Sequence, residues 1–213
     1  MVKGQIKWIK EHTIDNFLKW YRRSFLLKNK NFTIISNNCW GGKIYQRYGL
    51  PYTSPTIGLT FFADEYLKFV QNLEYYLSLD LKFIPKKKSK YYDFYTERDR
   101  YYPIGLLDDV EIVFLHYKSE KEAYEKWNRR KARMNWDNLI VKFNDQNRAT
   151  ADHIKAFDKL SFKNKLCFVA HVVDGTDCTI QFTEFEHDDY VKNDITSYSR
   201  YLNIDKYLND HTE

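Results

Sequence analysis

Three short polar segments carry the side chains that can do chemistry, and each follows a run of residues typical of a buried β-strand. They are residues 36–42 (SNNCWGG), 116–120 (HYKSE) and 144–147 (NDQN). In open α/β sheets, ligands bind beyond the carboxyl ends of the strands, where loops converge and helix N-termini present unpaired N–H groups. If the three strands are parallel neighbours, these segments share one rim, and we expect the active site there.

The first segment combines amide side chains with a pair of glycines. Ser36, Asn37 and Asn38 precede Gly41 and Gly42, so that side-chain amides and backbone N–H groups can be offered to a phosphate. The segment is neither a Walker A loop, which needs G-K-[ST], nor a dinucleotide-binding G-x-G-x-x-G sequence. A capped turn without a ligand is the structural alternative, and the sequence leaves both open.

Two residues are candidates for a general base. His116 ends an apolar run, where an imidazole can accept a proton near neutral pH, and a hydrogen-bonded structural histidine is the alternative. Asp145 with Asn147 resembles a D-x-D metal clamp only in part, because the second residue is an amide, and an Asx turn explains the pair equally well. A divalent cation bound with a nucleotide-sugar donor is a candidate cofactor, but the metal requirement stays unknown.

The remaining candidates for substrate binding are basic, aromatic or small and polar. Arg129 and Arg130 lie on a predicted helix at 119–133, and they can hold a diphosphate because guanidinium groups bind phosphate oxygens in pairs. A solvated basic helix face is the alternative. Aromatic rings can stack on sugars, and the set is completed by residues in or near the same segments: Trp40, Tyr52, Ser54, Tyr117, Trp136, Asn144 and Asn147.

The elements that must position these residues alternate along the chain. We predict strands at 31–36, 110–115, 138–143, 165–170 and 178–182, and helices at 43–48, 63–79, 119–133, 151–159 and 194–208. Strand–helix alternation of this kind predicts an α/β, Rossmann-like fold with a mainly parallel sheet flanked by helices. Because no linker is visible, we expect residues 31–213 to form a single domain that follows an N-terminal segment, 1–30.

That N-terminal segment holds the net charge of the chain. Residues 1–30 contain eight basic and two acidic residues, and the remainder contains 26 basic and 27 acidic ones. An apolar stripe recurs at helical spacing opposite the basic side chains, with Trp20 at its edge: Ile14, Phe17, Leu18, Tyr21 and Phe25. A basic amphipathic helix of this type can lie on an anionic membrane or pack its stripe on the domain. The neutral body, without a recognition motif, argues against nucleic acid.

Composition narrows the class of protein further. The chain has 213 residues, of which 43% are hydrophobic and 30% charged, as in a globular protein. No apolar run approaches the ~18–20 residues of a membrane-spanning helix, and no signal peptide is evident. Cys39, Cys167 and Cys178 form no C-x-x-C pair, so neither a disulfide framework nor a zinc ribbon is indicated. We therefore expect a reduced, cytoplasmic protein.

Several strings of residues resemble those of a known family. They are, in order, 32–42 (FTIISNNCWGG), 52–59 (YTSPTIGL), 102–105 (YPIG), 114–117 (FLHY), 127–130 (WNRR) and 135–139 (NWDNL). Together they resemble a bacterial family of unknown function whose members are often labelled exopolysaccharide or capsule biosynthesis proteins, over roughly residues 30–170. The resemblance implies a place in polysaccharide synthesis, since some relatives look like glycosyltransferases, including transferases of galactose or galactofuranose. It supplies no established catalytic residue.

The chain departs from the pattern of this family at three positions. Thr60 stands where a larger apolar residue is expected, Arg148 where a glycine usually follows the Asn-Asp-Gln-Asn turn, and Ser161 where proline is usual. Loss of a glycine with positive φ would strain the turn that carries Asp145. Arg148 is therefore the departure that bears most directly on the site.

Together these patterns predict a cytoplasmic, membrane-peripheral glycosyltransferase of exopolysaccharide or capsule synthesis. It would move a sugar from a nucleotide donor onto a lipid-linked saccharide, with the diphosphate held by the first polar segment and the arginines. His116 or Asp145 would remove the proton of the acceptor hydroxyl. The alternatives are an acyl or phosphoryl-type transferase that modifies the polysaccharide, and a non-enzymatic adaptor recruited to the membrane by the N-terminal helix.

Overall fold

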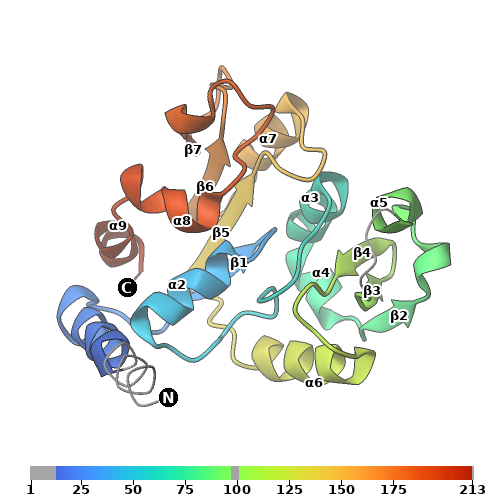
Figure 1. Cartoon of the computed structure of the whole chain (residues 1–213), viewed down its shortest axis with the longest axis horizontal. Helices are drawn as coiled ribbons and strands as arrows, with labels where there is room; N and C mark the ends of the chain where they lie inside the picture. The colour runs from blue at the N-terminus through green and yellow to red at the C-terminus, as the bar shows by residue number, and fades with distance from the viewer. Residues whose placement is uncertain (1–12, 97–100, 213) are drawn as a thin grey trace, which may run out of the picture.

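A parallel sheet forms the centre of the computed structural model, which describes residues 13–96 and 101–212. Its strand order is β1-β5-β6-β7, with every neighbouring pair parallel. The strands are β1 (Thr33–Ser36), β5 (Leu139–Asn144), β6 (Asn164–Val169) and β7 (Thr179–Gln181). The fold is α/β with a mainly parallel sheet flanked by helices, as the sequence predicts, and it is consistent with a Rossmann-like architecture (Figure 1).

Both faces of this sheet are buried, which explains why its strands read as nearly continuous apolar runs. Ile35, Val141 and Phe143 point into one core, together with side chains of α3 (Ala63–Gln71), α6 (Glu120–Lys131) and α7 (Ala151–Asp158). The alternate residues Ile34 and Ile140 point into a second core with α2 (Trp40–Tyr48) and α9 (Ile204–His211). The two-residue period of a strand thus assigns its side chains to opposite layers.

A second, antiparallel sheet corrects one part of the prediction. It has the order β2-β3-β4, formed by β2 (Lys82–Ile84), β3 (Ile104–Leu107) and β4 (Val110–Val113). The strand expected at 110–115 therefore does not belong to the parallel sheet, because it pairs locally with β3 across a tight turn. His116 follows β4 and so comes from this smaller sheet. An antiparallel bridge between Thr60 and Val113 connects β4 to the segment before α3.

Two of the predicted helices are divided in the structure. The helix expected at 63–79 breaks at Asn72 into α3 and α4 (Leu73–Ser78), and the helix expected at 194–208 becomes α8 (Asp194–Ser197), a short 3-10 turn and α9. Helix α2 begins at Trp40 and packs closely on β1, since a Cβ at Gly41 would lie 3.2 Å from Cγ2 of Ile34. The structure also contains α5 (Tyr92–Thr96).

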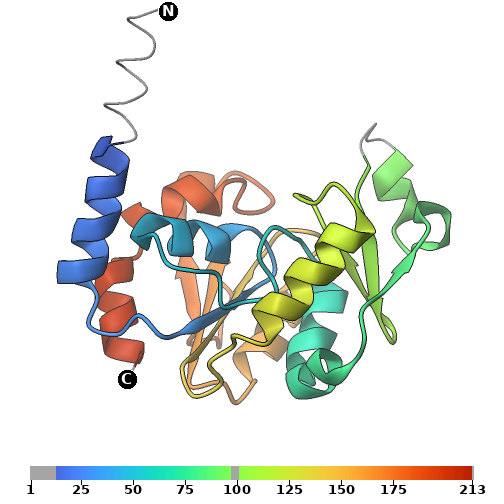
Figure 2. The same cartoon turned by 90° about the horizontal axis from the view of Figure 1, so that it is seen from below.

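The N-terminal helix lies beside α2 and α9 at one end of the molecule (Figures 1 and 2). It is helical over 13–21 and continues as a π-helical segment, Arg22–Leu26, while residues 1–12 of the predicted segment lie outside the described residues. Its apolar stripe is exposed, with Phe17 58% and Phe25 64% accessible, and does not pack on the domain. Among the described residues, no helix combines the length and apolarity needed to cross a bilayer.

Candidate functional site

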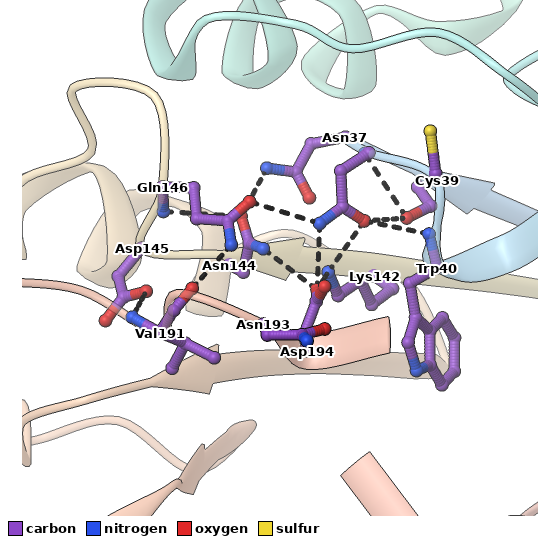
Figure 3. A network of polar contacts seen from close by, with 12 residues as sticks. Asn37, Cys39, Trp40, Lys142, Asn144, Asp145, Gln146, Val191, Asn193 and Asp194 are labelled. Atoms are coloured by element: carbon purple, nitrogen blue, oxygen red, sulfur yellow. Dashed lines mark hydrogen bonds and ion pairs between the residues drawn. The ribbon is translucent and has the colours of Figure 1, made fainter. Parts of the chain in front are cut away.

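The turns after β1 and β5 meet at the carboxyl edge of the parallel sheet, as predicted. The Asn37 side-chain amide donates to Oδ1 of Asn144 at 2.7 Å, and the Asn37 backbone N–H donates to the Lys142 carbonyl at 3.4 Å. Figure 3 shows how these amides converge with Asp194, which arrives from the start of α8. The expectation of a shared rim therefore holds for the first and third polar segments.

Lys142 and Asp194 form the centre of this edge. The Lys142 ammonium group contacts Oδ2 of Asp194, which also accepts hydrogen bonds from the amides of Asn38 at 2.8 Å and Asn144 at 2.9 Å. Burial lowers the pKa of Lys142, and the Asp194 carboxylate opposes that shift. This satisfied, fully buried arrangement ties the C-terminal segment to the middle of the sheet and is structural.

Several predicted binding residues are committed to such internal contacts. Trp40 is fully buried against Phe168 and Tyr198, so it cannot stack on a sugar. Further predicted residues are buried or have their polar groups turned inward and do not reach the surface of the clefts described below: Ser36, Asn37, Gly41, Ser54 and Asn144. The structural alternative, a capped turn, describes most of the first segment.

Asp145 is also a structural residue and not a general base. Its two carboxylate oxygens accept from the backbone N–H of Ala170 at 2.6 Å and of Val191 at 2.9 Å. Burial raises the pKa of Asp145, although these two hydrogen bonds act in the opposite direction. Because both oxygens accept backbone hydrogen bonds and Asp145 lines neither of the two clefts described below, the predicted catalytic role of Asp145 does not fit the geometry.

A cationic cleft of about 360 Å³ lies beside this edge, between α2, the loop 52–58, the segment after β4 and α6. Its polar and charged lining consists of Cys39, Lys43, Gln46, His116, Lys126 and Arg130. Gly42, Tyr52, Ile57, Gly58, Tyr117 and Ile195 complete the walls. Because no Asp or Glu is among these described lining residues, the cleft attracts anions.

Arg130 forms one wall of the cationic cleft and is held rigidly. Its Nη1 donates to the Ile57 carbonyl at 3.1 Å and to the Tyr117 hydroxyl at 2.5 Å. The guanidinium lies 4.9 Å from the centroid of the Tyr52 ring, a cation–π contact. The hydrogen bonds of this group within the described residues all start from Nη1, so Nε and Nη2 remain for an anionic ligand.

His116 and Cys39 lie at the mouth of the same cleft. The His116 backbone N–H is fixed by the Gly58 carbonyl at 3.0 Å, and its side chain is exposed, as a proton acceptor for a bound hydroxyl must be. Burial raises the pKa of the Cys39 thiol to about 11, and Asp194 adds to that shift. Cys39 is therefore protonated near neutral pH and is not a nucleophile.

An adjoining cleft of about 220 Å³ continues the cationic cleft along the sheet edge. Cys39 and Ile195 line both clefts. The first and third polar segments contribute to the adjoining cleft through Asn38 and Asn147, and Leu115, the residue before the second segment, also lines it. The departure at position 60 has a role here, because the Thr60 hydroxyl donates to the Asn37 carbonyl at 3.2 Å and accepts from Asn147 at 2.8 Å. Threonine thus links two of the turns.

The turn that follows Asn144 is strained where the sequence predicts strain. Asn147 and Arg148 have φ values of 56° and 67°, in the left-handed region that favours glycine. The Arg148 guanidinium lies 5.4 Å from the Phe62 ring and 5.6 Å from the Tyr91 ring, contacts that a glycine would not make. The arginine side chain thus makes cation–π contacts at a position whose backbone conformation favours glycine.

Two predicted residues lie away from the cationic cleft. Arg129 is exposed on α6 and does not line it, since consecutive residues on a helix point about 100° apart. Trp136 lies before β5, at the opposite edge of the sheet, beside a cavity of about 670 Å³. Neither side chain can contact a ligand held by Arg130 and His116.

Sequence reasoning missed residues that the structure brings to the site. Lys43 lies one turn into α2 and lines the cleft. Lys126 precedes Arg130 by four residues and therefore lies on the same face of α6, a relationship that the helical period predicts from sequence. Lys142 was signalled by a charge within an otherwise apolar strand, whereas nothing in the local sequence marked Asp194. Among the described residues, no group of three or more His, Cys, Asp or Glu is placed to hold a metal ion.

Comparison with known protein families shows to which family the chain belongs. A family model described as a domain of unknown function, DUF1919, matches residues 10–212. The chain belongs to this family. It is also 39% identical over 142 residues to an uncharacterized protein of Haemophilus influenzae, an alignment that covers 67% of this chain and 63% of that relative. Membership of DUF1919 therefore rests on nearly the whole sequence, including every element around the cationic cleft.

Proposed function

We propose that this DUF1919 protein is a glycosyltransferase of exopolysaccharide or capsule synthesis that transfers a sugar from a nucleoside diphosphate donor to a lipid-linked saccharide at the cytoplasmic face of a membrane. The observation that carries the proposal is the cationic cleft at the carboxyl edge of the sheet. Arg130, Lys126 and Lys43 line it beside the N-terminus of α2, and no carboxylate is among its described lining residues, although Lys126 is paired with Glu122 at 2.5 Å. Such a site suits a diphosphate, which carries negative charge on closely spaced oxygens.

In the proposed reaction, the diphosphate of the donor lies against Arg130 and Lys126. The bond between the anomeric carbon and the diphosphate oxygen breaks, and its electron pair remains on the diphosphate. Fixed cations next to that oxygen stabilise the developing charge without reorganising during the reaction. The partial positive dipole at the N-terminus of α2 acts in the same direction.

The acceptor hydroxyl attacks the anomeric carbon from the adjoining cleft. Its oxygen forms the new glycosidic bond, and its proton passes to the His116 imidazole. Asn147 lines the adjoining cleft. Its NH₂ group donates to Thr60 and to the Phe61 carbonyl, and its Oδ1 can accept from a sugar hydroxyl. Tyr52 supplies an aromatic ring at the cationic end, although one of its faces is covered by Arg130.

Calorimetric titration with UDP tests the cleft directly. Lys43→Gln with Lys126→Gln removes two charges and should weaken binding by about tenfold or more, since each charge-assisted hydrogen bond contributes about 1.5–3 kcal/mol. Arg129→Gln with Lys121→Gln removes two exposed charges from α6 outside the cleft and serves as the matched control. Equal affinities for the two double variants would refute the assignment of this cleft.

The product distinguishes the proposed reaction from the acyl or phosphoryl-type alternative. Incubation with UDP-sugars and a lipid-linked saccharide should release UDP and give a glycosylated lipid, whereas an acyltransferase would release free coenzyme A from acetyl-coenzyme A. Release of coenzyme A without UDP would reject the glycosyltransferase. Transfer that survives His116→Ala would remove His116 from the mechanism and leave the donor site in place.

A further inference from the structure

The N-terminal helix presents an unusual surface to solvent. Its outward aromatic face comprises large apolar side chains that are each more than a third exposed: Ile14, Phe17, Leu18, Trp20, Tyr21 and Phe25. The rings contact one another, with centroid distances of 5.7 Å for Phe17–Trp20, 5.5 Å for Trp20–Phe25 and 5.3 Å for Tyr21–Phe25. Contiguous apolar patches of this kind mark interaction sites.

Contacts on the other side of the helix hold this face outward. Arg23 donates from Nη1 to the Gly49 carbonyl at 3.1 Å, and the Lys19 side chain packs over the same glycine. Where the helix ends, the Asn209 side chain accepts from the Lys28 N–H and donates to the Leu26 carbonyl, both at 2.8 Å. The basic side of the helix therefore docks on α2 and α9, and the apolar side has no counterpart among the described residues.

We propose that the outward aromatic face docks this protein on an anionic lipid bilayer. Trp and Phe are the side chains that insert at the boundary between headgroups and acyl chains, and basic residues beside them are attracted to anionic headgroups. Lys28 and Lys30 are exposed just beyond the helix, and Arg22 is half-exposed along its flank. The helix then lies between the bilayer and the body of the protein.

Charge selects the bilayer over a second copy of the chain. Residues 13–30, the described part of this segment, carry five basic residues and one acidic residue, so pairing this face with itself would bring two positive segments together. An anionic surface has the opposite sign and neutralises the same residues. The proposal rests on the proposed function only in that a lipid-linked acceptor requires a bilayer, and its test uses neither donor nor acceptor.

Vesicle flotation tests the docking surface. The whole protein should float with vesicles containing about 30% phosphatidylglycerol in phosphatidylcholine and much less with phosphatidylcholine alone. Phe17→Ser with Phe25→Ser should weaken partitioning by about tenfold or more, since each substitution removes a ring that would otherwise be buried among the acyl chains. Tyr101→Ser with Val172→Ser, two exposed side chains elsewhere, is the matched control and should change partitioning by less than about twofold.

Further measurements separate the other outcomes. Lys28→Gln with Lys30→Gln should weaken binding to anionic vesicles, and added salt should do the same. A lipid-induced blue shift of tryptophan fluorescence that is lost in Trp20→Phe would place the face in the bilayer. Vesicle binding that is absent, or equal in the phenylalanine and control variants, overturns the proposal. The proposal is also overturned if the protein forms a dimer without lipid and the variant with Phe17→Ser and Phe25→Ser does not, since this result would assign the face to self-association. UDP binding is unaffected by any of these results.

Discussion

Lys142 and Asp194 form an ion pair in which the side chains are 0% and 2% exposed. Lys142 lies on the middle of β5 and Asp194 at the first residue of α8, so the pair connects the sheet to the C-terminal segment. The oxygen of Asp194 that contacts Lys142 also accepts hydrogen bonds from the amides of Asn38 and Asn144. The pair therefore shapes the edge beside which both clefts open, although it is inaccessible to a substrate.

Breaking this pair should be costly for stability. Lys142→Met leaves the Asp194 carboxylate buried without its counter-charge, and we expect a loss of about 3–5 kcal/mol in the free energy of unfolding. Lys142→Met combined with Asp194→Leu removes both charges and should lose markedly less than the sum of the single changes. Urea denaturation of the four proteins measures both quantities. Strictly additive losses would contradict the pairing.

Substitution of the two candidate bases should have opposite effects. Asp145→Asn replaces one carboxylate oxygen with an NH₂ group that faces a backbone N–H, so it should cost about 1–3 kcal/mol of stability and leave sugar transfer largely intact. His116→Asn alters an exposed side chain, so it should abolish transfer while changing stability by less than about 0.5 kcal/mol. Thermal unfolding and initial rates check the two effects. Loss of transfer in a folded Asp145→Asn protein would restore Asp145 as a base.

The reactivity of Cys39 should depend on pH in a specific way. Because burial raises the pKa of this thiol to about 11, the thiolate fraction stays small near neutral pH and grows as pH rises. In a Cys178→Ser background, the rate of alkylation by iodoacetamide should rise by about tenfold per pH unit between about pH 7 and 9.5, without a plateau. The same chain unfolded in guanidinium should level off above about pH 9.

The cleft position of Cys39 adds a control to this measurement. Because Cys39 lines both clefts, saturating UDP should slow alkylation of the folded protein and have no effect on the unfolded one. A plateau at a pH well below the raised pKa would contradict burial of the thiol. Unchanged alkylation at saturating UDP would place the nucleotide elsewhere.

Glycine and alanine at position 148 should give proteins of different stability. Both Arg148→Gly and Arg148→Ala remove the contacts with Phe62 and Tyr91, but only glycine relieves the positive φ of 67°. The glycine variant should therefore be more stable than the alanine variant by about 1 kcal/mol. Chemical denaturation at equal protein concentration measures the difference. An alanine variant of equal or greater stability would show that the turn is not strained.

The strands of the parallel sheet could be predicted from sequence because each is marked by its own residues. The apolar runs that became β1 and β5 each end in a polar turn, and burial on both faces makes such runs recognisable without knowledge of their neighbours. The strain at Arg148 was predicted from the resemblance to the family, in which glycine is usual at this position, because a positive φ is unfavourable for any residue with a Cβ. The pairing of β2 with β3 escaped prediction because strands of three and four residues carry little signal of their own.

Membership of the site was decided by contacts between distant segments. Asp194 has no local mark, yet it fixes amides from two turns because α8 folds back over the sheet. Asp145 looks like a base in the sequence but is occupied by N–H groups of Ala170 and Val191. A polar side chain can bind a ligand only if partners within the folded chain do not already occupy its hydrogen-bonding groups.

The N-terminal helix shows the same division. By itself, the sequence determined that an apolar stripe and a basic side exist, because the helical period separates them at any orientation. It could not determine which side faces the domain. Gly49 and Asn209, which lie far along the chain, bind the polar side through hydrogen bonds and so leave Phe17 and Phe25 exposed. Orientation follows from partners that meet only in the folded chain.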